Sequence, residues 1–259
     1  MANSLLYINQ GALDSAENIW CVGRDLTVYN GQSWTYYNYL NSVVPSNDPY
    51  YLDTRSISID SDDTKWVGCA VSSGLSQDLI FYAAGSQAAT GSAWAINNFN
   101  LSGSNWEVPT IYASPFGDEI LAFISPLNGG GGTGATGNVG VTGGYLWSYN
   151  KVTSEWNEIS PGYTWPHIYE IKAKGKDGVN WDYYLATTDG LQIIPNGILD
   201  TSLLQDGSNF IPSLKKVNAY NSSINTNTVY SISFDEEGHY WLGTQNGLTY
   251  WDGSKYYNW

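Results

Sequence analysis

One short pattern recurs along this chain and limits what the chain can fold into. Ser56-Ile57-Ser58-Ile59-Asp60, continued by Trp66-Val67-Gly68, aligns without a gap on Ser231-Ile232-Ser233-Phe234-Asp235, continued by Trp241-Leu242-Gly243. Polar and apolar residues alternate before each aspartate, which predicts a strand with one buried face. The chain is therefore expected to repeat one β-unit along its length.

Residues 231–259 show what one such unit contains. Four strands are expected here, at Ser231–Asp235, His239–Thr244, Leu248–Trp251 and Lys255–Trp259. An Asn-Gly pair, a strong hairpin signal, separates the second strand from the third. A four-stranded meander of this size cannot bury its faces alone, so it needs neighbours of the same kind.

Three further copies are weaker. Near the N-terminus, Asp14 again stands six residues before Trp20, and Tyr184–Leu191 matches Trp241–Leu248 position for position. Another copy runs through Ile111–Ser125. Spacings of about 45 to 65 residues between four-stranded units are typical of a β-propeller.

The predicted fold is all-β: a five-bladed β-propeller of four-stranded antiparallel blades, formed as a single domain over residues 1–259. The blades are expected at approximately residues 4–41, 55–105, 106–160, 165–220 and 228–259. A Gly-rich insertion at 128–144 has glycine at every third position from 131 to 143 but no proline. This insertion predicts a loop within the third blade, because a collagen-like helix needs prolines and more triplets.

These copies resemble the two-component-regulator type of propeller repeat. In that repeat an alternating strand and an Asp/Gly turn precede an aromatic-aliphatic-Gly-Thr strand and an Asn/Asp-Gly-Leu turn. The last copy carries the pattern best, in Trp241-Leu242-Gly243-Thr244 and Asn246-Gly247-Leu248. The resemblance covers most of the chain and implies the propeller scaffold, but it leaves the activity open.

Residues at one position of every copy face the same environment. We therefore predict that they pack or form turns, in preference to sugar stacking by the tryptophans or proton transfer by the aspartates. These structural repeat residues are Asp14, Trp20, Asp60, Trp66, Tyr184, Gly190, Asp235, Trp241 and Gly247.

The charge of the chain excludes two classes of partner. Its 24 acidic and 10 basic residues give a net charge of −14. It therefore lacks the basic surface that nucleic acid or an anionic membrane would require. No apolar stretch is long enough to span a bilayer, and residues 1–6 do not read as a secretory signal peptide.

The composition is typical of a surface-exposed protein. Richness in Asn, Ser, Thr, Gly and Tyr without an export signal resembles bacteriophage virion proteins, which assemble in the host cytoplasm. The expected localisation is the virion, in a tail, baseplate or receptor-binding appendage, with the cytoplasm as the alternative. Expected partners are other virion proteins or a host-surface glycan, and a homo-oligomer is compatible with the sequence.

No catalytic site, metal or cofactor is predicted. Cys21 and Cys69 are expected to be buried free thiols, and neither His167 nor His239 has a ligand set at metal-binding spacing. Acids at 60–63 and 235–238 could supply oxygen to calcium but lack the alternating ligands of an EF-hand. No nucleophile elbow, phosphate-binding loop or zinc-protease motif occurs, and two arginines are too few for the arginine triad of a sialidase.

The predicted function is a non-enzymatic interaction module whose loops at one end of the propeller dock a protein or a glycan. Aromatic residues in irregular segments are the candidate contacts: Tyr50, Tyr51, Tyr163 and Trp165. Two alternatives stay open. One is a soluble multivalent lectin with sugar pockets between blades, and the other is a propeller glycoside hydrolase or lyase, because 24 acids can supply a catalytic pair.

Overall fold

The structure is a computed structural model of the 259-residue chain. It describes residues 8–23, 25–37, 54–72, 78–83, 95–98, 105–116, 118–126, 143–159, 163–175, 180–197 and 214–259. The strands β1 to β20 and a short 3-10 turn, η2 (Pro195–Gly197), lie in these ranges. No helix among the described residues is long and apolar enough to cross a membrane.

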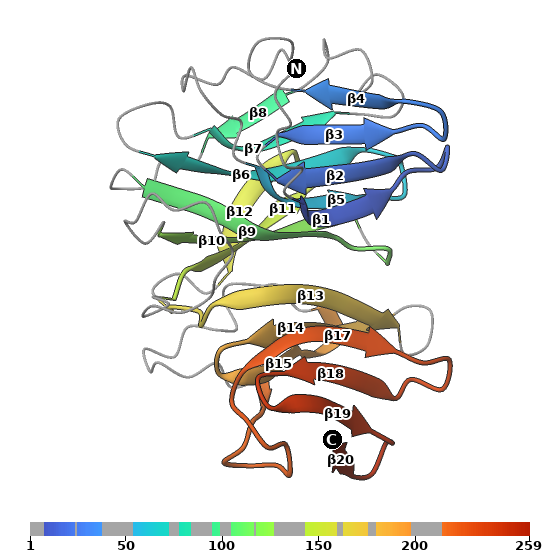
Figure 1. The fold of residues 1–259 in the computed structure, drawn as a ribbon. Coiled ribbons are helices and arrows are strands. Elements are labelled where there is room, and N and C mark those ends of the chain that lie inside the picture. The colour runs from blue at the N-terminus through green and yellow to red at the C-terminus, as the bar shows by residue number, and fades with distance from the viewer. Residues whose placement is uncertain are drawn as a thin grey trace. The chain divides into compact units, whose positions relative to one another are not determined.

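Hydrogen bonding sorts the described strands into four sheets, three of which have four strands in chain order (Figure 1). The first contains β1 (Ile8–Leu13), β2 (Ile19–Gly23), β3 (Leu26–Tyr29) and β4 (Trp34–Tyr37). The third contains β13 (Ile168–Gly175), β14 (Trp181–Thr187), β15 (Gly190–Ile194) and β16 (Lys215–Val217). The fourth contains β17 (Val229–Phe234), β18 (Tyr240–Thr244), β19 (Gly247–Trp251) and β20 (Tyr256–Asn258).

The second sheet has eight strands in the order β12-β11-β10-β9-β6-β7-β8, with β5 paired to β6. Its first half contains β5 (Thr54–Ile59), β6 (Lys65–Ser72), β7 (Asp78–Ala83) and β8 (Ala95–Asn98). Its second half contains β9 (Asn105–Ala113), β10 (Glu119–Pro126), β11 (Tyr145–Asn150) and β12 (Glu155–Ile159).

The prediction of five blades is wrong: the fold is an all-β propeller of antiparallel sheets with four blades. The reason lies in β6, which is long enough to pair with β9 as well as with β5 and β7. Lys65–Gly68 pair with β7, and Ala70–Ser72 pair with Asn105–Glu107 of β9. The second and third predicted blades are therefore joined in one sheet. The Gly-rich insertion predicted at 128–144 lies outside the described residues except for Gly143 and Gly144.

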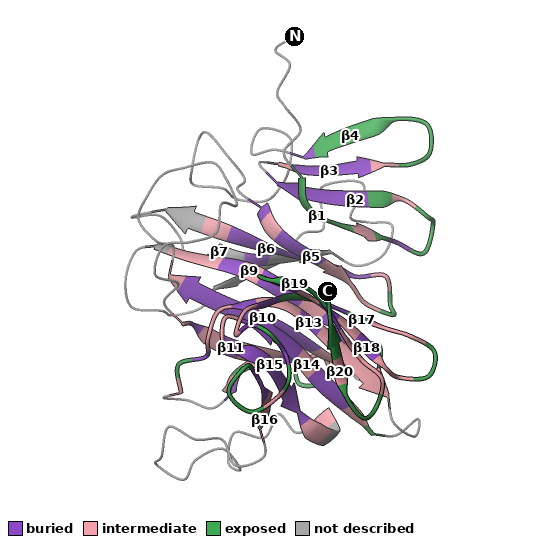
Figure 2. Cartoon of the chain, turned by 60° about the horizontal axis from the view of Figure 1, so that its bottom comes forward, coloured by how far each residue is buried: buried purple, intermediate pink, exposed green. Residues whose placement is uncertain are grey.

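Side chains are less buried in the edge strand β4 than in the central strand β10. Three of the four residues of β4, an edge strand, are exposed, whereas the six central residues of β10 are buried (Figure 2). Edge strands face solvent on one side, so they carry few core side chains. The central strands supply most of the buried apolar surface.

The chain divides into two compact units, residues 1–113 with 124–140 and residues 114–123 with 141–259. In the first unit, Trp20, Leu26 and Tyr37 of the first sheet pack with Ile57 and Val67 of the second sheet. Cys21 and Cys69 are both buried, as predicted. In the second unit, a cluster of nine buried side chains joins the third sheet to the fourth.

Three turns between the first two strands of a repeat have the same geometry, and each begins at a repeat aspartate. The amides of Asp14, Asp60 and Asp235 each donate to the carbonyl four residues later, at 3.1 Å. One carboxylate oxygen accepts the amide hydrogen bond from that same residue, at 2.8 to 2.9 Å. The fourth residue of each turn has a positive φ, namely Glu17 (62°), Asp63 (63°) and Gly238 (89°).

A buried lysine connects two of these turns in the first unit. Lys65 is 1% exposed, and its Nζ lies 2.8 Å from the Asp63 carboxylate and 3.5 Å from that of Asp14. The same Nζ lies over the Trp20 ring, 5.5 Å from its centroid. Trp20 Nε1 donates to Asp14 Oδ2 at 2.9 Å, so the carboxylate and the ammonium share one buried network.

We expect Gly238→Ala to lower the free energy of unfolding by about 1 kcal/mol, because an L-residue is strained at a φ of +89°. A Cβ at this position meets only Lys174 Cε at 3.5 Å, so the loss comes from the backbone. Urea denaturation measures the change, with the exposed neighbour Glu237→Ala as the control. Equal stability of Gly238→Ala and the parent chain would contradict the turn geometry.

The stability of the first unit should depend on pH in the acid range. Burial acts to raise the pKa of Asp14, but hydrogen bonds from Asn18 and Trp20 and the charge of Lys65 outweigh burial and lower it to about 2. Since the unfolded pKa is about 3.9, this stabilisation is present above pH 4 and is lost as the pH falls to 2. Thermal unfolding between pH 5 and 2 tests this. In Asp14→Asn the unfolding temperature should change less with pH than in the parent chain.

Candidate ligand-binding site

Three strands of the fourth sheet each carry two adjacent aromatic residues. The pairs are Tyr240-Trp241, Tyr250-Trp251 and Tyr256-Tyr257. Neighbours along a strand point to opposite faces, so each pair places one ring on each face. The register aligns Tyr240 with Trp251 and Trp251 with Tyr256, and it aligns the other three rings in the same way. Each face of this sheet therefore has a row of three aromatic rings.

The inner row, defined as Tyr240, Trp251 and Tyr256, faces the third sheet. Its ring centroids lie 6.2 Å apart for Tyr240 and Trp251 and 4.5 Å apart for Trp251 and Tyr256. Tyr184 of β14 joins the row, 5.8 Å from Tyr240. The Tyr240 and Tyr256 hydroxyls share a hydrogen bond of 2.7 Å.

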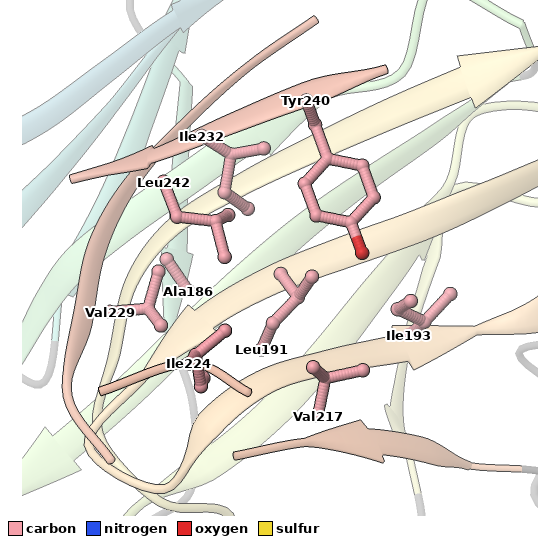
Figure 3. Close-up of a cluster of buried hydrophobic side chains, with 9 residues drawn as sticks. All are labelled: Ala186, Leu191, Ile193, Val217, Ile224, Val229, Ile232, Tyr240 and Leu242. Atoms are coloured by element: carbon pink, nitrogen blue, oxygen red, sulfur yellow. The ribbon is translucent and has the colours of Figure 1, made fainter. Parts of the chain in front are cut away.

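Apolar packing beside this row holds the two sheets together. Figure 3 shows Leu191, Ile193 and Val217 of the third sheet pointing toward Ile232 and Leu242 of the fourth. Leu242 is fully buried, and the other four are at most 6% exposed. The Tyr240 ring extends across this cluster, so its position is determined by close packing from both sheets.

The inner row forms one wall of a cavity of about 340 Å³, within the range of small-ligand sites. The aromatic lining is Tyr184, Tyr240, Trp251 and Tyr256, and the polar lining is Lys215, Lys216, Asn221 and Ser222. Asn221 donates to the Lys216 carbonyl at 2.9 Å, and Ser222 donates to the Asn218 carbonyl at 2.7 Å. The polar wall is thus ordered by its own hydrogen bonds.

The two lysines of β16 point in opposite directions. Lys215 pairs with Ile193 and Lys216 with Gln192, so alternation places Lys215 on the cavity face with Ile193 and Tyr184. Lys216 forms an ion pair with Asp189. Lys215 therefore contributes the positive charge of the cavity.

The tyrosines of the cavity remain neutral near physiological pH. Burial raises the pKa of Tyr184 to about 12, and burial also raises the pKa values of Tyr240 and Tyr256. None of the described residues that line the cavity is a carboxylic acid or a histidine, the groups that most often transfer protons. The arrangement suits binding better than acid-base chemistry.

The outer row, defined as Trp241, Tyr250 and Tyr257, lies on the opposite face of the sheet. Trp241 and Tyr250 have centroids 4.4 Å apart, and Trp259, which is 64% exposed, stacks on Trp241 at 5.7 Å. This row provides exposed rings that do not contribute to the cavity. It is therefore a source of matched control substitutions.

A titratable cluster adjoins the outer row. Asp235 Oδ2 lies 3.1 Å from His239 Nδ1, and the Tyr250 hydroxyl lies 3.0 Å from the same nitrogen. With Glu237, the ligand atoms of Asp235 and His239 lie within 4.8 Å of one another, which is close enough to hold a metal ion. The sequence analysis named the acids at 235–238 but missed their combination with His239, although acids and a histidine at every second position from 235 to 239 are a visible signal.

The last repeat departs here from the earlier ones. Trp20 Nε1 donates to Asp14, and Trp66 Nε1 donates to Asp60 at 3.0 Å. In the last repeat, the corresponding oxygen of Asp235 contacts His239 instead, and the Trp241 ring belongs to the outer row. Repeat tryptophans are thus buried in the first unit, where Trp20 and Trp66 are each 2% exposed, but not in the last repeat.

The candidate contact residues predicted from the sequence do not gather at the cavity. Tyr50 and Tyr51 lie outside the described residues. Trp165 is 1% exposed and donates Nε1 to the Ile159 carbonyl at 3.1 Å, so its indole is closed to a partner. Tyr163 packs edge-on against Trp165 at 5.1 Å. Of the predicted repeat residues, Tyr184 lines the cavity.

Gly190 and Gly247 close the hairpins that position the cavity strands. Each has a positive φ, 91° and 116°, and a Cβ there would approach a backbone oxygen to 2.3 and 2.1 Å. Thr187 and Thr244 donate Oγ1 to these glycines' carbonyls, each at 2.8 Å. Both hairpins therefore have one geometry, in agreement with the alignment of their sequences.

The fold is similar to several solved structures of low sequence identity. The chain is 18% identical to the extracellular domain of a proposed hybrid two-component system from B. thetaiotaomicron, with a TM-score of 0.63 over 93% of this chain and 26% of that chain. It is 15% identical to PorZ, a bacterial surface component of the type-IX secretion system of Porphyromonas gingivalis, with a TM-score of 0.60 over 93% of this chain and 31% of that chain. A gluconolactonase from Xanthomonas campestris has a TM-score of 0.57 at 11% identity, over 95% of this chain and 72% of that chain.

These similarities show the propeller fold and no activity, because every identity is low. The two-component-system domain shares the propeller fold expected from the sequence. This chain spans about a quarter of the length of that structure. No protein-family model and no curated protein matches the sequence. The bacteriophage role expected from composition finds no support in these structures.

We expect Tyr256→Phe to lower the free energy of unfolding by about 1 to 3 kcal/mol, because the buried Tyr240 hydroxyl would lose its hydrogen-bond partner. Tyr257→Phe is the matched control, because that hydroxyl bonds Asp252 at an exposed site. Urea denaturation compares the two variants. If Tyr257→Phe lowers the free energy of unfolding as much as Tyr256→Phe does, the hydrogen bond between Tyr240 and Tyr256 contributes no more to stability than the exposed one.

Proposed function

We propose that this chain is a non-enzymatic binding module that holds a saccharide in the cavity between its third and fourth sheets. The cavity of about 340 Å³ with four aromatic side chains carries the proposal. Apolar faces of sugar rings pack against aromatic faces, while amide, hydroxyl and ammonium groups bond sugar hydroxyls. Both kinds of group line this cavity.

Two observations support binding in preference to catalysis. The described lining lacks a carboxylate pair, which glycoside hydrolysis requires. The similar structures from the hybrid two-component system and the type-IX secretion system are described as an extracellular domain and a surface component. A pocket between sheets also agrees with the lectin alternative of the sequence analysis. A virion localisation stays a prediction from composition.

Isothermal titration of the full chain with a panel of neutral and acidic monosaccharides and disaccharides tests the proposal. We expect Trp251→Ala to weaken binding at least tenfold, because stacking on the indole would be lost. Trp259→Ala, an indole on the opposite face, should bind as the parent chain does. Circular dichroism and melting curves confirm that each variant is folded.

Trp251 also packs against Tyr240, so its removal could disturb the fold. Ser222→Ala on the polar wall then gives a second readout, and a severalfold weaker affinity is expected. Its melting curve is the control, because the hydroxyl also bonds Asn218 and Ile224. Absence of binding to every saccharide in the panel would overturn the proposal. So would equal losses in Trp251→Ala and Trp259→Ala.

A further inference from the structure

We propose that the saccharide held by this cavity carries a carboxylate, so that its class is a uronic acid or an oligosaccharide ending in one. This inference rests on the function proposed above and narrows it to one ligand chemistry. The inference rests on the charge of the cavity lining. The chain has 24 acidic and 10 basic residues, so a cavity with basic and no acidic lining differs in sign from the protein as a whole.

The positive charge of the cavity belongs to Lys215. Strand alternation places this side chain on the face of β16 that lines the cavity, whereas Lys216 is neutralised by Asp189. Other basic residues have acidic or aromatic neighbours: Lys65 with Asp63, Lys172 with Glu170, Arg55 with Glu107, and Lys255 with Tyr257. Among the described residues, Lys215 has no ion-pair partner.

Nothing in the described lining compensates this charge. The lining contains tyrosines, a tryptophan, aliphatic residues, an asparagine and a serine, and the tyrosines are kept neutral by burial. An ammonium group without a neighbouring carboxylate is complementary to an anion. Because the protein carries a net charge of −14, the local cation is also needed to offset repulsion of an anionic ligand.

The aromatic walls restrict which anion fits. A small inorganic anion would contact Lys215 but would not fill the space beside Tyr184, Tyr256 and Trp251. A uronic acid has a sugar ring for these faces and a carboxylate for Lys215. Lys215 is exposed, so salt should screen its contribution, and the preference for acidic sugars should be modest.

Isothermal titration at about 20 mM and 150 mM salt compares glucuronate and galacturonate with glucose and galactose, and with acetate as an anion without a ring. The parent chain should bind the uronates about fivefold tighter than the neutral sugars at low salt, with a smaller ratio at high salt. Lys215→Gln should bring the ratio to about one, and Lys215→Arg should keep it above two. Lys255→Gln changes a lysine outside the cavity, in the turn before β20, and should leave the ratio unchanged.

The outcomes separate this inference from the proposed function. Equal affinity for uronates and neutral sugars, unchanged by Lys215→Gln, overturns the inference while leaving a saccharide site. Acetate binding as tight as uronate binding overturns it too, because the ring would then contribute nothing. Absence of binding to all the sugars overturns the proposed function and this inference together.

Discussion

The turn that begins at the repeat aspartate is the interaction on which the rest of this structure depends. In each of three copies one carboxylate oxygen accepts the amide of the residue four positions later, and this closes a five-residue turn. Closing the turn fixes the register of the following strand, and in a sheet a shift of one residue moves every side chain to the other face. In β18 buried and half-buried positions alternate after the turn at Asp235, whereas β2 and the first five residues of β6 are buried almost throughout.

The second carboxylate oxygen distinguishes the copies. In the first unit it binds a tryptophan indole, and Lys65 adds a buried charge that joins two neighbouring turns. In the last copy it contacts His239, and Trp241 stacks in the outer row. The different partner of the aspartate and the lower burial of the tryptophan thus occur in the same copy. The same register places Tyr240, Trp251 and Tyr256 on the inner face, where they form the cavity wall.

Much of the local structure could be predicted from the sequence. The four strands of the last repeat, its Asn-Gly hairpin and the matching hairpin at Gly190 depend on alternation and on turn chemistry, which act over a few residues. The number of blades could not be predicted, because β6 and β9 pair across about 35 residues through edges that carry no repeat signal. Trp165 was expected at a surface because its segment is irregular, but the neighbouring strand ends enclose it.

The sequence by itself determined that this chain forms short antiparallel strands in repeated units, with aspartate and glycine turns at defined positions. Only the tertiary structure decided which ring of each aromatic pair faces a second sheet, and which of two adjacent lysines at the cavity is paired with an aspartate. Because side chains alternate along a strand, Tyr240 and Trp241 lie on opposite faces, and so do Lys215 and Lys216. The alternation does not predict which face another sheet will cover. That choice depends on packing between segments far apart in the chain, and it is the packing of the third sheet on the fourth that makes the candidate site.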